Sequence, residues 1–197
     1  MPRLLAVKPE EASGQTKDLL DAVQKKLGMV PNLIRTFANS PAVLQAYLGF
    51  SSALENGVLS PQLREQIALA VGQANQCDYC LSAHTAIGKM VGLSEEDILD
   101  NRLAKSTDSK TQSALRFARS VVEKKGLVSD QDVEQVKSAK FTDAEIAEII
   151  AAVSLNVFTN YFNHVAETVV DFPPAAAVED ESCTTDSMSA QAGCGCN

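Results

Sequence analysis

The chain has 197 residues, of which 45% are hydrophobic, which suits one domain with a sizeable core. A formal net charge of −8, 5% aromatic residues and no tryptophan exclude the basic or base-stacking surfaces typical of nucleic-acid binding. No apolar run approaches the length of a membrane span, and the N-terminal apolar run is too short for a signal-peptide core. We therefore expect a cytoplasmic protein with neither a nucleic-acid nor a membrane partner.

Two helix starts in the first half of the chain share the pair Ser-Pro. Ser40 and Ser60 can each act as the N-cap, and the proline that follows each serine suits the first helical position. Gly57 is placed to end the first of these helices. Apolar residues recur at helical spacing after both starts. The sequence therefore predicts helices over residues 40–57 and 60–76.

The second half of the chain repeats this pattern. Ser94, Ser109, Ser129 and Thr142 can each cap a segment in which apolar residues have a helical period. Strand signals are nearly absent, because no stretch alternates cleanly and no Asn-Gly or Asp-Gly turn joins two apolar runs. We predict an all-α fold, a single helical domain of about seven or eight helices.

The composition changes at residue 173. Small and polar residues, two prolines and no bulky apolar period indicate a disordered C-terminal tail. The predicted organisation is a helical domain over residues 1–172 and a flexible tail over 173–197. This tail holds three of the five cysteines, Cys183, Cys194 and Cys196.

The segment CDYCLSAH carries the strongest chemical signal in the chain. On a helix that begins near Cys77, this residue, Cys80 and His84 share one face, because they are spaced i, i+3 and i+7. A thiol at a helix N-terminus lies at the positive end of the helix dipole, which favours the thiolate. In a cytosolic protein such a pair indicates redox or metal chemistry rather than a permanent structural disulfide.

Glu65 lies on the preceding predicted helix and can take part if the chain turns between the two helices. Asn75-Gln76 offers a plausible break. A turn there would bring Glu65 back toward His84 or Cys80 and assemble an acid, a base and a thiol, as around an activated cysteine nucleophile. The sequence permits this geometry without requiring it, since Glu65 could equally be a solvated helix residue.

Other interpretations of the pair remain open at this point. A zinc site would need a fourth ligand beyond Cys77, Cys80 and His84, and no second short-spaced pair lies in the predicted domain. A thioredoxin-type motif would follow a strand, and no strand is predicted. The two thiols could also be inert and buried, and Tyr79 between them is most simply a packing aromatic.

The whole pattern resembles the signature of the AhpD-like alkylhydroperoxidases, which belong to the carboxymuconolactone decarboxylase superfamily. The matching run is Glu65, eleven residues, Cys77, two residues, Cys80, three residues and His84. The likeness is dense over residues 60–92. It is looser over about 30–172, where NYFNHVAETVVDFP also looks like peroxidase-related members.

This resemblance implies roles for the matched residues. It implies that Cys80 attacks peroxide, that Cys77 resolves the sulfenic acid as a redox-active disulfide, and that Glu65 and His84 form a proton relay that deprotonates Cys80. The best-studied type has histidine where this chain has Tyr79, which could hydrogen-bond in the site but cannot supply an imidazole. The family also implies an all-helical homo-oligomer, a trimer or a trimer-based assembly.

We therefore expect a thiol-dependent peroxidase that reduces hydrogen peroxide or an alkyl hydroperoxide, with an antioxidant role and no bound cofactor. Because the chain has no nucleotide-binding glycine fingerprint, the expected reductant is another protein or a lipoyl-type dithiol. The alternatives are a carboxymuconolactone decarboxylase-like enzyme, whose known members generally lack this cysteine pair, and a non-enzymatic zinc-binding or redox-sensing module.

Two features lie outside the resemblance. His164, on the last long predicted helix, suits a core or interface position or the lining of a pocket. The tail cysteines Cys183, Cys194 and Cys196 could relay electrons to the Cys77–Cys80 pair, bind a soft metal, or be dispensable.

Overall fold

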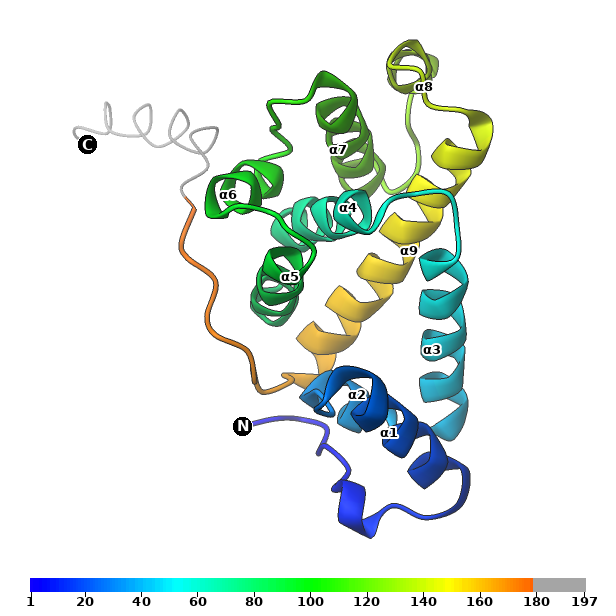
Figure 1. Ribbon diagram of the computed structural model, residues 1–197, viewed down its shortest axis with the longest axis vertical. Coiled ribbons are helices and arrows are strands. Elements are labelled where there is room, and N and C mark those ends of the chain that lie inside the picture. Colours follow the sequence, from blue (N-terminus) through cyan, green and yellow to red (C-terminus); the bar gives the residue numbers. More distant parts are fainter. Residues whose placement is uncertain (179–197) are drawn as a thin grey trace, which may run out of the picture.

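The computed structural model describes residues 1–178, which form an all-α bundle as predicted (Figure 1). Within this range there are nine α-helices, a short 3-10 helix and no strand, so the helix count slightly exceeds the expected seven or eight. The helices are α1 (Gly14–Leu27), α2 (Asn32–Phe37), α3 (Pro41–Glu55), α4 (Pro61–Ala74), α5 (Asp78–Met90), α6 (Glu95–Arg102), α7 (Ser109–Glu123), α8 (Asp130–Ser138) and α9 (Asp143–Ala166), and η1 is Pro9–Glu11.

Side-chain caps begin most of the predicted helices, because they satisfy backbone N–H groups that have no partner within the helix. The caps found where the sequence predicted them are Ser40, Ser60, Ser94, Ser129 and Thr142. The prediction was wrong at α7, where Asp108 rather than Ser109 is the cap. The Asp108 carboxylate accepts a hydrogen bond from the Thr111 N–H at 2.7 Å, and Ser109 becomes the first helical residue.

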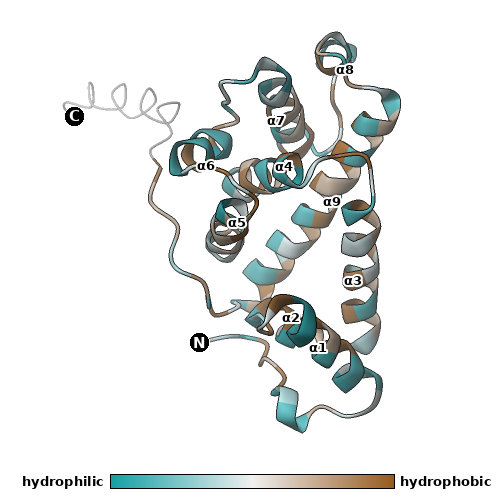
Figure 2. Ribbon diagram, in the orientation of Figure 1, coloured by the Kyte–Doolittle hydropathy of each residue, from teal (hydrophilic) through white to brown (hydrophobic). Residues whose placement is uncertain are grey.

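α4 lies in the middle of the bundle and contacts α5, α6, α7 and α9 (Figure 1). Residues 66–72 of this helix are all buried, which explains why apolar residues cover more than one of its faces. α9 is the longest helix, and hydrophobic and hydrophilic bands alternate along it (Figure 2). No helix in residues 1–178 is both long and apolar enough to cross a membrane.

Buried apolar side chains form two main clusters. The first joins α4, α7, α8 and α9 around Ile67, Leu115 and Ile149. The second joins α1, α2, α3 and α5, and it includes Cys77 and Cys80. The cysteine pair therefore lies within a hydrophobic core and not on the surface.

One carboxylate ties the connection between α3 and α4 to α9. The Glu148 side chain accepts hydrogen bonds from the N–H groups of Val58, at 2.8 Å, and Leu59, at 3.0 Å. Gly57 directly precedes them, and a Cβ at this position would overlap the Glu148 carboxylate. The absence of a side chain at Gly57 is what lets the carboxylate approach the backbone this closely.

The segment after α9 runs alongside α5 and α6 (Figure 1). Buried Ser82 accepts a hydrogen bond from the Ala175 N–H at 3.3 Å, and buried Arg102 donates one to the Ala176 carbonyl at 2.5 Å. Residues 173–178, which the sequence assigned to the tail, thus contact the helical domain. The remainder of the predicted tail lies outside the described residues.

Candidate active site

The turn between α4 and α5 occurs at the predicted break and sets the geometry of the site. α4 ends at Ala74, and Gln76 adopts a left-handed conformation with φ of 54°. The Cys77 N–H then donates to the Gly72 carbonyl at 2.9 Å and the Gln76 N–H to the Gln73 carbonyl at 3.0 Å, the two bonds of a Schellman motif. This motif reverses the chain, so that α5 packs back against α4.

The two cysteines lie at the start of α5. Cys77 is the N-cap residue and Cys80 is in the first turn, so both are near the positive end of the helix dipole. Their Sγ atoms are 2.8 Å apart, both thiols are free, and both side chains are buried. Two sulfurs on one zinc ion would lie about 3.8 Å apart, given tetrahedral geometry and Zn–S bonds of about 2.3 Å.

Glu65 and His84 meet across the two helices, as the predicted turn would allow. Glu65 lies on α4 and His84 on α5, and Glu65 Oε2 is 2.7 Å from His84 Nδ1. The side chains are 18% and 21% exposed, so the pair is largely shielded from solvent. His84 follows Cys80 by four residues and therefore lies one turn further along the same face of α5.

A fifth polar group, which the sequence analysis did not assign to the site, comes from α9. The Asn163 side-chain amide donates a hydrogen bond to Cys80 Sγ at 3.3 Å. Asn163 is buried, and it approaches the sulfur from a helix 83 positions further along the chain. The available sequence signal was a set of asparagines, Asn156, Asn160 and Asn163, at a spacing that places them on one face of the last helix.

The two thiols have opposite protonation tendencies. The hydrogen bond from Cys77 lowers the pKa of Cys80 below the ordinary thiol value of 9.0. Burial raises this pKa, but the charge of His84 and the hydrogen bond from the Asn163 amide lower it further. The pKa of Cys77 is raised, because it is the donor in this bond and is itself buried. The arrangement thus favours one thiolate, on Cys80, with the proton of the pair on Cys77.

His84 is biased toward its charged form. Burial opposes protonation, but the charge of Glu65, its hydrogen bond and the nearby Cys80 together raise the pKa of His84 above the ordinary 6.5. The site therefore favours a thiolate and an imidazolium on one helix face, with a carboxylate behind the imidazolium.

The other predicted residues have different surroundings. The Tyr79 hydroxyl accepts a hydrogen bond from the Leu33 N–H at 3.1 Å, and its ring meets the Phe172 ring edge-on at 5.9 Å. Burial, with the Asp171 carboxylate nearby, raises the pKa of Tyr79 despite the Leu33 bond, so the phenol is neutral. His164 is exposed and lies away from the buried face of α9 that carries Asn163. Cys183, Cys194 and Cys196 lie outside the described residues.

Tyr47 on α3 is a second residue near the site that the sequence analysis did not assign to it. Its ring packs against Phe37 with centroids 5.0 Å apart, in the same hydrophobic cluster as the cysteines. Burial raises the pKa of Tyr47 to about 12, and the charges of Glu65 and Cys80 add to this effect. Tyr47 therefore packs against the hydrophobic cluster that contains the two cysteines.

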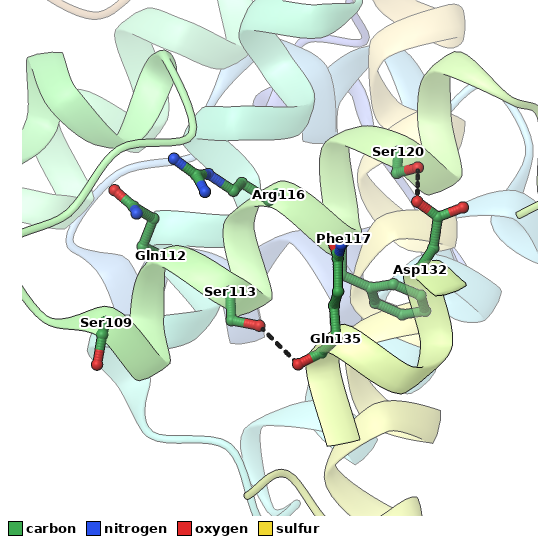
Figure 3. Close-up of a pocket in the computed structure, with 8 residues that line it drawn as sticks. All are labelled: Ser109, Gln112, Ser113, Arg116, Phe117, Ser120, Asp132 and Gln135. Atoms are coloured by element: carbon green, nitrogen blue, oxygen red, sulfur yellow. Dashed lines mark hydrogen bonds between the residues drawn. The ribbon is translucent and has the colours of Figure 1, made fainter. Parts of the chain in front are cut away.

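The described residues offer no other centre that combines these groups. A pocket of about 320 Å³ lies between α7 and α8, lined by Arg116, Phe117, Asp132 and other polar side chains (Figure 3). It contains neither a thiol nor any residue of the predicted site. No group of three or more His, Cys, Asp or Glu side chains in residues 1–178 is arranged to hold a metal ion.

Comparisons with known proteins find solved structures with a similar fold. The peroxidase-related protein from Ralstonia eutropha JMP134, described as an alkylhydroperoxidase AhpD core, is 26% identical with a TM-score of 0.77 over 86% of this chain and 92% of that one. The peroxidase-related protein from Silicibacter sp. TM1040 is 27% identical with a TM-score of 0.72, over 87% and 92%. Residues 41–124 match the model of the carboxymuconolactone decarboxylase family. This part of the chain is similar to that family.

The carboxymuconolactone decarboxylase match spans α3 to α7 and so contains the Glu65, Cys77, Cys80 and His84 arrangement but not Asn163. The fold is AhpD-like, which confirms the resemblance seen in the sequence. The same fold occurs in the debrominase Bmp8, solved with 2,3,4-tribromopyrrole, at 17% identity and a TM-score of 0.74 over 85% of this chain and 91% of that one. The comparison with curated proteins found no match.

Proposed function

We propose that the protein is a thiol peroxidase that reduces hydrogen peroxide or an alkyl hydroperoxide in antioxidant defence. The observation that carries this proposal is the environment of Cys80, whose sulfur lies 2.8 Å from the Cys77 sulfur and accepts a hydrogen bond from Asn163. A peroxide-reducing cysteine needs a stabilised thiolate and a second thiol within bonding reach. This site has both, and its apolar surroundings suit a small hydroperoxide.

The first step forms a bond between sulfur and oxygen. The Cys80 thiolate attacks the terminal oxygen of the hydroperoxide, the O–O bond breaks, and the remaining oxygen leaves with the electron pair as an alkoxide or hydroxide. His84 gives this oxygen its proton, so that an alcohol or water forms. Cys80 is left as a sulfenic acid, having lost two electrons.

The second step uses the neighbouring thiol. The Cys77 sulfur attacks the sulfur of the Cys80 sulfenic acid, an S–S bond forms, and the S–O bond breaks. The hydroxide that leaves combines with the Cys77 proton as water. The short distance between the sulfurs favours this step, because little movement of α5 is needed to reach a disulfide bond length of about 2.05 Å.

An external dithiol then completes the cycle by thiol–disulfide exchange. It gives two electrons and two protons to the Cys77–Cys80 disulfide and becomes a disulfide itself. We expect a protein or lipoyl-type dithiol in this role, because the chain has no nucleotide-binding glycine fingerprint. We also expect a homo-oligomer, since apolar side chains of α9, among them Tyr161 and Val165, are exposed in the single chain.

Glu65 has a supporting role in this scheme. Its carboxylate, 2.7 Å from His84 Nδ1, favours the imidazolium that the first step uses as a proton donor. The proton that leaves Cys80 at the start of the cycle is the one that His84 later delivers to the departing oxygen. Glu65 and His84 therefore act as one unit that moves a single proton.

The decarboxylase alternative uses the same acid and base on a carbon substrate, but it gives the buried thiol pair no task. The zinc alternative would require both sulfurs and His84 to converge on one ion, and the sulfurs are too close together for that geometry. The thiol peroxidase accounts for all four groups.

A single-turnover reaction tests the proposal. One equivalent of hydrogen peroxide, added to the fully reduced protein, should be consumed with loss of two thiols, and mass spectrometry should find Cys77 and Cys80 linked within one peptide. Cys183, Cys194 and Cys196 should be replaced by serine in a matched control, so that the thiol count reports on the pair alone. If both thiols stay free while the peroxide remains, the protein is not a thiol peroxidase.

A further inference from the structure

α9 buries three amides on one face. Asn156, Asn160 and Asn163 are spaced i, i+4 and i+7, and their exposed fractions are 8%, 0% and 5%. Buried amides are unfavourable unless their hydrogen bonds are made, and an apolar side chain of similar size could fill each position. The partners of these three amides therefore indicate what each is for.

Asn156 is satisfied within its own helix, because its side-chain amide donates to the Ala152 carbonyl at 2.8 Å. The side chains of Asn160 and Asn163 instead contact residues at the turn between α4 and α5. Asn163 donates to Cys80 Sγ at 3.3 Å. The oxygen of Asn160 accepts a hydrogen bond from the side chain of Asn75 at 2.8 Å, while its Nδ2 donor has no partner among the described residues.

The Asn75 contact fixes which way the Asn160 amide faces. Asn75 is the C-cap residue of α4, so its position is set by the same turn that places Cys77 and Cys80. With its oxygen held by Asn75, Asn160 presents its NH₂ group as the free end. Asn160 lies one turn before Asn163 on the same buried face of α9, so this free NH₂ group is on the side of the helix from which Asn163 reaches Cys80.

We propose that Asn163 and Asn160 are catalytic residues that act as a pair of amide donors. Asn163 donates a hydrogen bond to the Cys80 sulfur while this is a thiolate, and Asn160 donates one to the oxygen atom that the sulfur receives from the peroxide. The proposal rests on the peroxidase function inferred above. As the S–O bond forms and the O–O bond breaks, negative charge spreads from sulfur onto oxygen, and a preorganised donor at that oxygen stabilises the charge where it develops.

The test separates the two roles with two reagents. In a Cys77→Ser background, the rate of Cys80 alkylation by iodoacetamide is followed against pH, and the rate of sulfenic acid formation with hydrogen peroxide is followed by trapping with dimedone. The variants are Asn163→Leu and Asn160→Leu. Asn156→Leu is the matched control, because it removes a buried amide from the same face without touching the site.

Asn163→Leu should raise the pKa of Cys80, so that alkylation at a pH below that value slows about tenfold for each pKa unit. Asn160→Leu should slow the peroxide reaction by about 10²–10³-fold, the range found for loss of one oxyanion donor, and slow alkylation much less. Asn156→Leu should change neither rate. Asn163→Ala and Asn160→Ala replace the leucine variants if circular dichroism shows that those do not fold.

Unchanged alkylation in the Asn163 variants, or peroxide rates in the Asn160 variants that fall no more than alkylation, would overturn the assignment. Equal losses in Asn156→Leu would also overturn it, because the effect would then belong to packing. If the wild-type protein does not react with peroxide, the peroxidase proposal fails instead. The alkylation profile would still decide whether Asn163 stabilises the thiolate.

Discussion

Replacing Glu65 with glutamine removes the charge behind His84 while keeping a hydrogen-bond acceptor 2.7 Å from Nδ1. Unit charges about 4 Å apart interact by about 4 kcal/mol at an effective dielectric constant of 20. Both side chains are partly exposed, which screens this interaction. Because the charge of Glu65 is one of the causes that raise the pKa of His84, we expect this pKa to fall in the variant.

The lower pKa of His84 should act on the chemistry in two ways. A smaller fraction of His84 is then protonated, so Cys80 loses part of the positive charge that favours its thiolate, and the departing oxygen loses part of its proton donor. The peroxide rate should fall by about 10²–10⁴-fold, the usual contribution of general acid–base catalysis. His84→Gln should cause a similar loss, and the double variant should lose little more, because the two groups act on one proton.

Stopped-flow peroxide consumption and NMR titration of the His84 ring together measure both effects. Glu95→Gln is the matched control, since it removes an exposed carboxylate that pairs with Lys89 at the other end of α5. Circular dichroism should show that each variant keeps its helical content. If Glu65→Gln retains the wild-type rate and the pKa of His84 does not move, Glu65 is a solvated helix residue and the relay does not exist.

Three further results are expected. The peroxide rate should depend on pH as a bell-shaped curve, which rises through the lowered pKa of Cys80 and falls through the raised pKa of His84. The variant His84→Gln should lack the fall at alkaline pH. A rate that only rises with pH, through the ordinary thiol pKa of 9.0, would contradict this. Gly57→Ala should destabilise the protein by about 1–3 kcal/mol, because the new methyl group displaces Glu148 from two backbone N–H groups. Calorimetry should show a lower melting temperature for this variant than for the control Gly49→Ala, whose added Cβ contacts no other atom. Light scattering should find an oligomer at micromolar concentration that Tyr161→Glu weakens, and a wild-type monomer would rule out assembly through α9.

Much of the site could be predicted because it depends on local rules. The spacing of Cys77, Cys80 and His84 fixes their common face on any helix that begins at Cys77, and this face is found. The turn at Asn75-Gln76 was also predictable as a break, and it brings Glu65 to His84 as one of the permitted geometries. Helix caps followed from residue type for the same reason, since a cap needs only the next three residues.

The parts that could not be predicted depend on contacts between distant segments. Asn163 reaches Cys80 only because α9 crosses α5, and Tyr47 joins the site only because α3 and α5 share one hydrophobic cluster. No local rule relates residues so far apart in the chain. The cap of α7 was missed for a subtler reason, since Asp108 and Ser109 are both good caps and only the backbone conformation decides between them.

Steady-state turnover tests the central claim most directly. Hydrogen peroxide and an alkyl hydroperoxide should each be consumed catalytically when a lipoyl-type or thioredoxin-type dithiol is supplied, with many turnovers per protein chain. Cys80→Ser should abolish this activity, and Cys77→Ser should stop it after the first oxidation, because no resolving thiol remains. Peroxide consumption that is absent with every dithiol, or that persists at the wild-type rate in Cys80→Ser, would contradict the account.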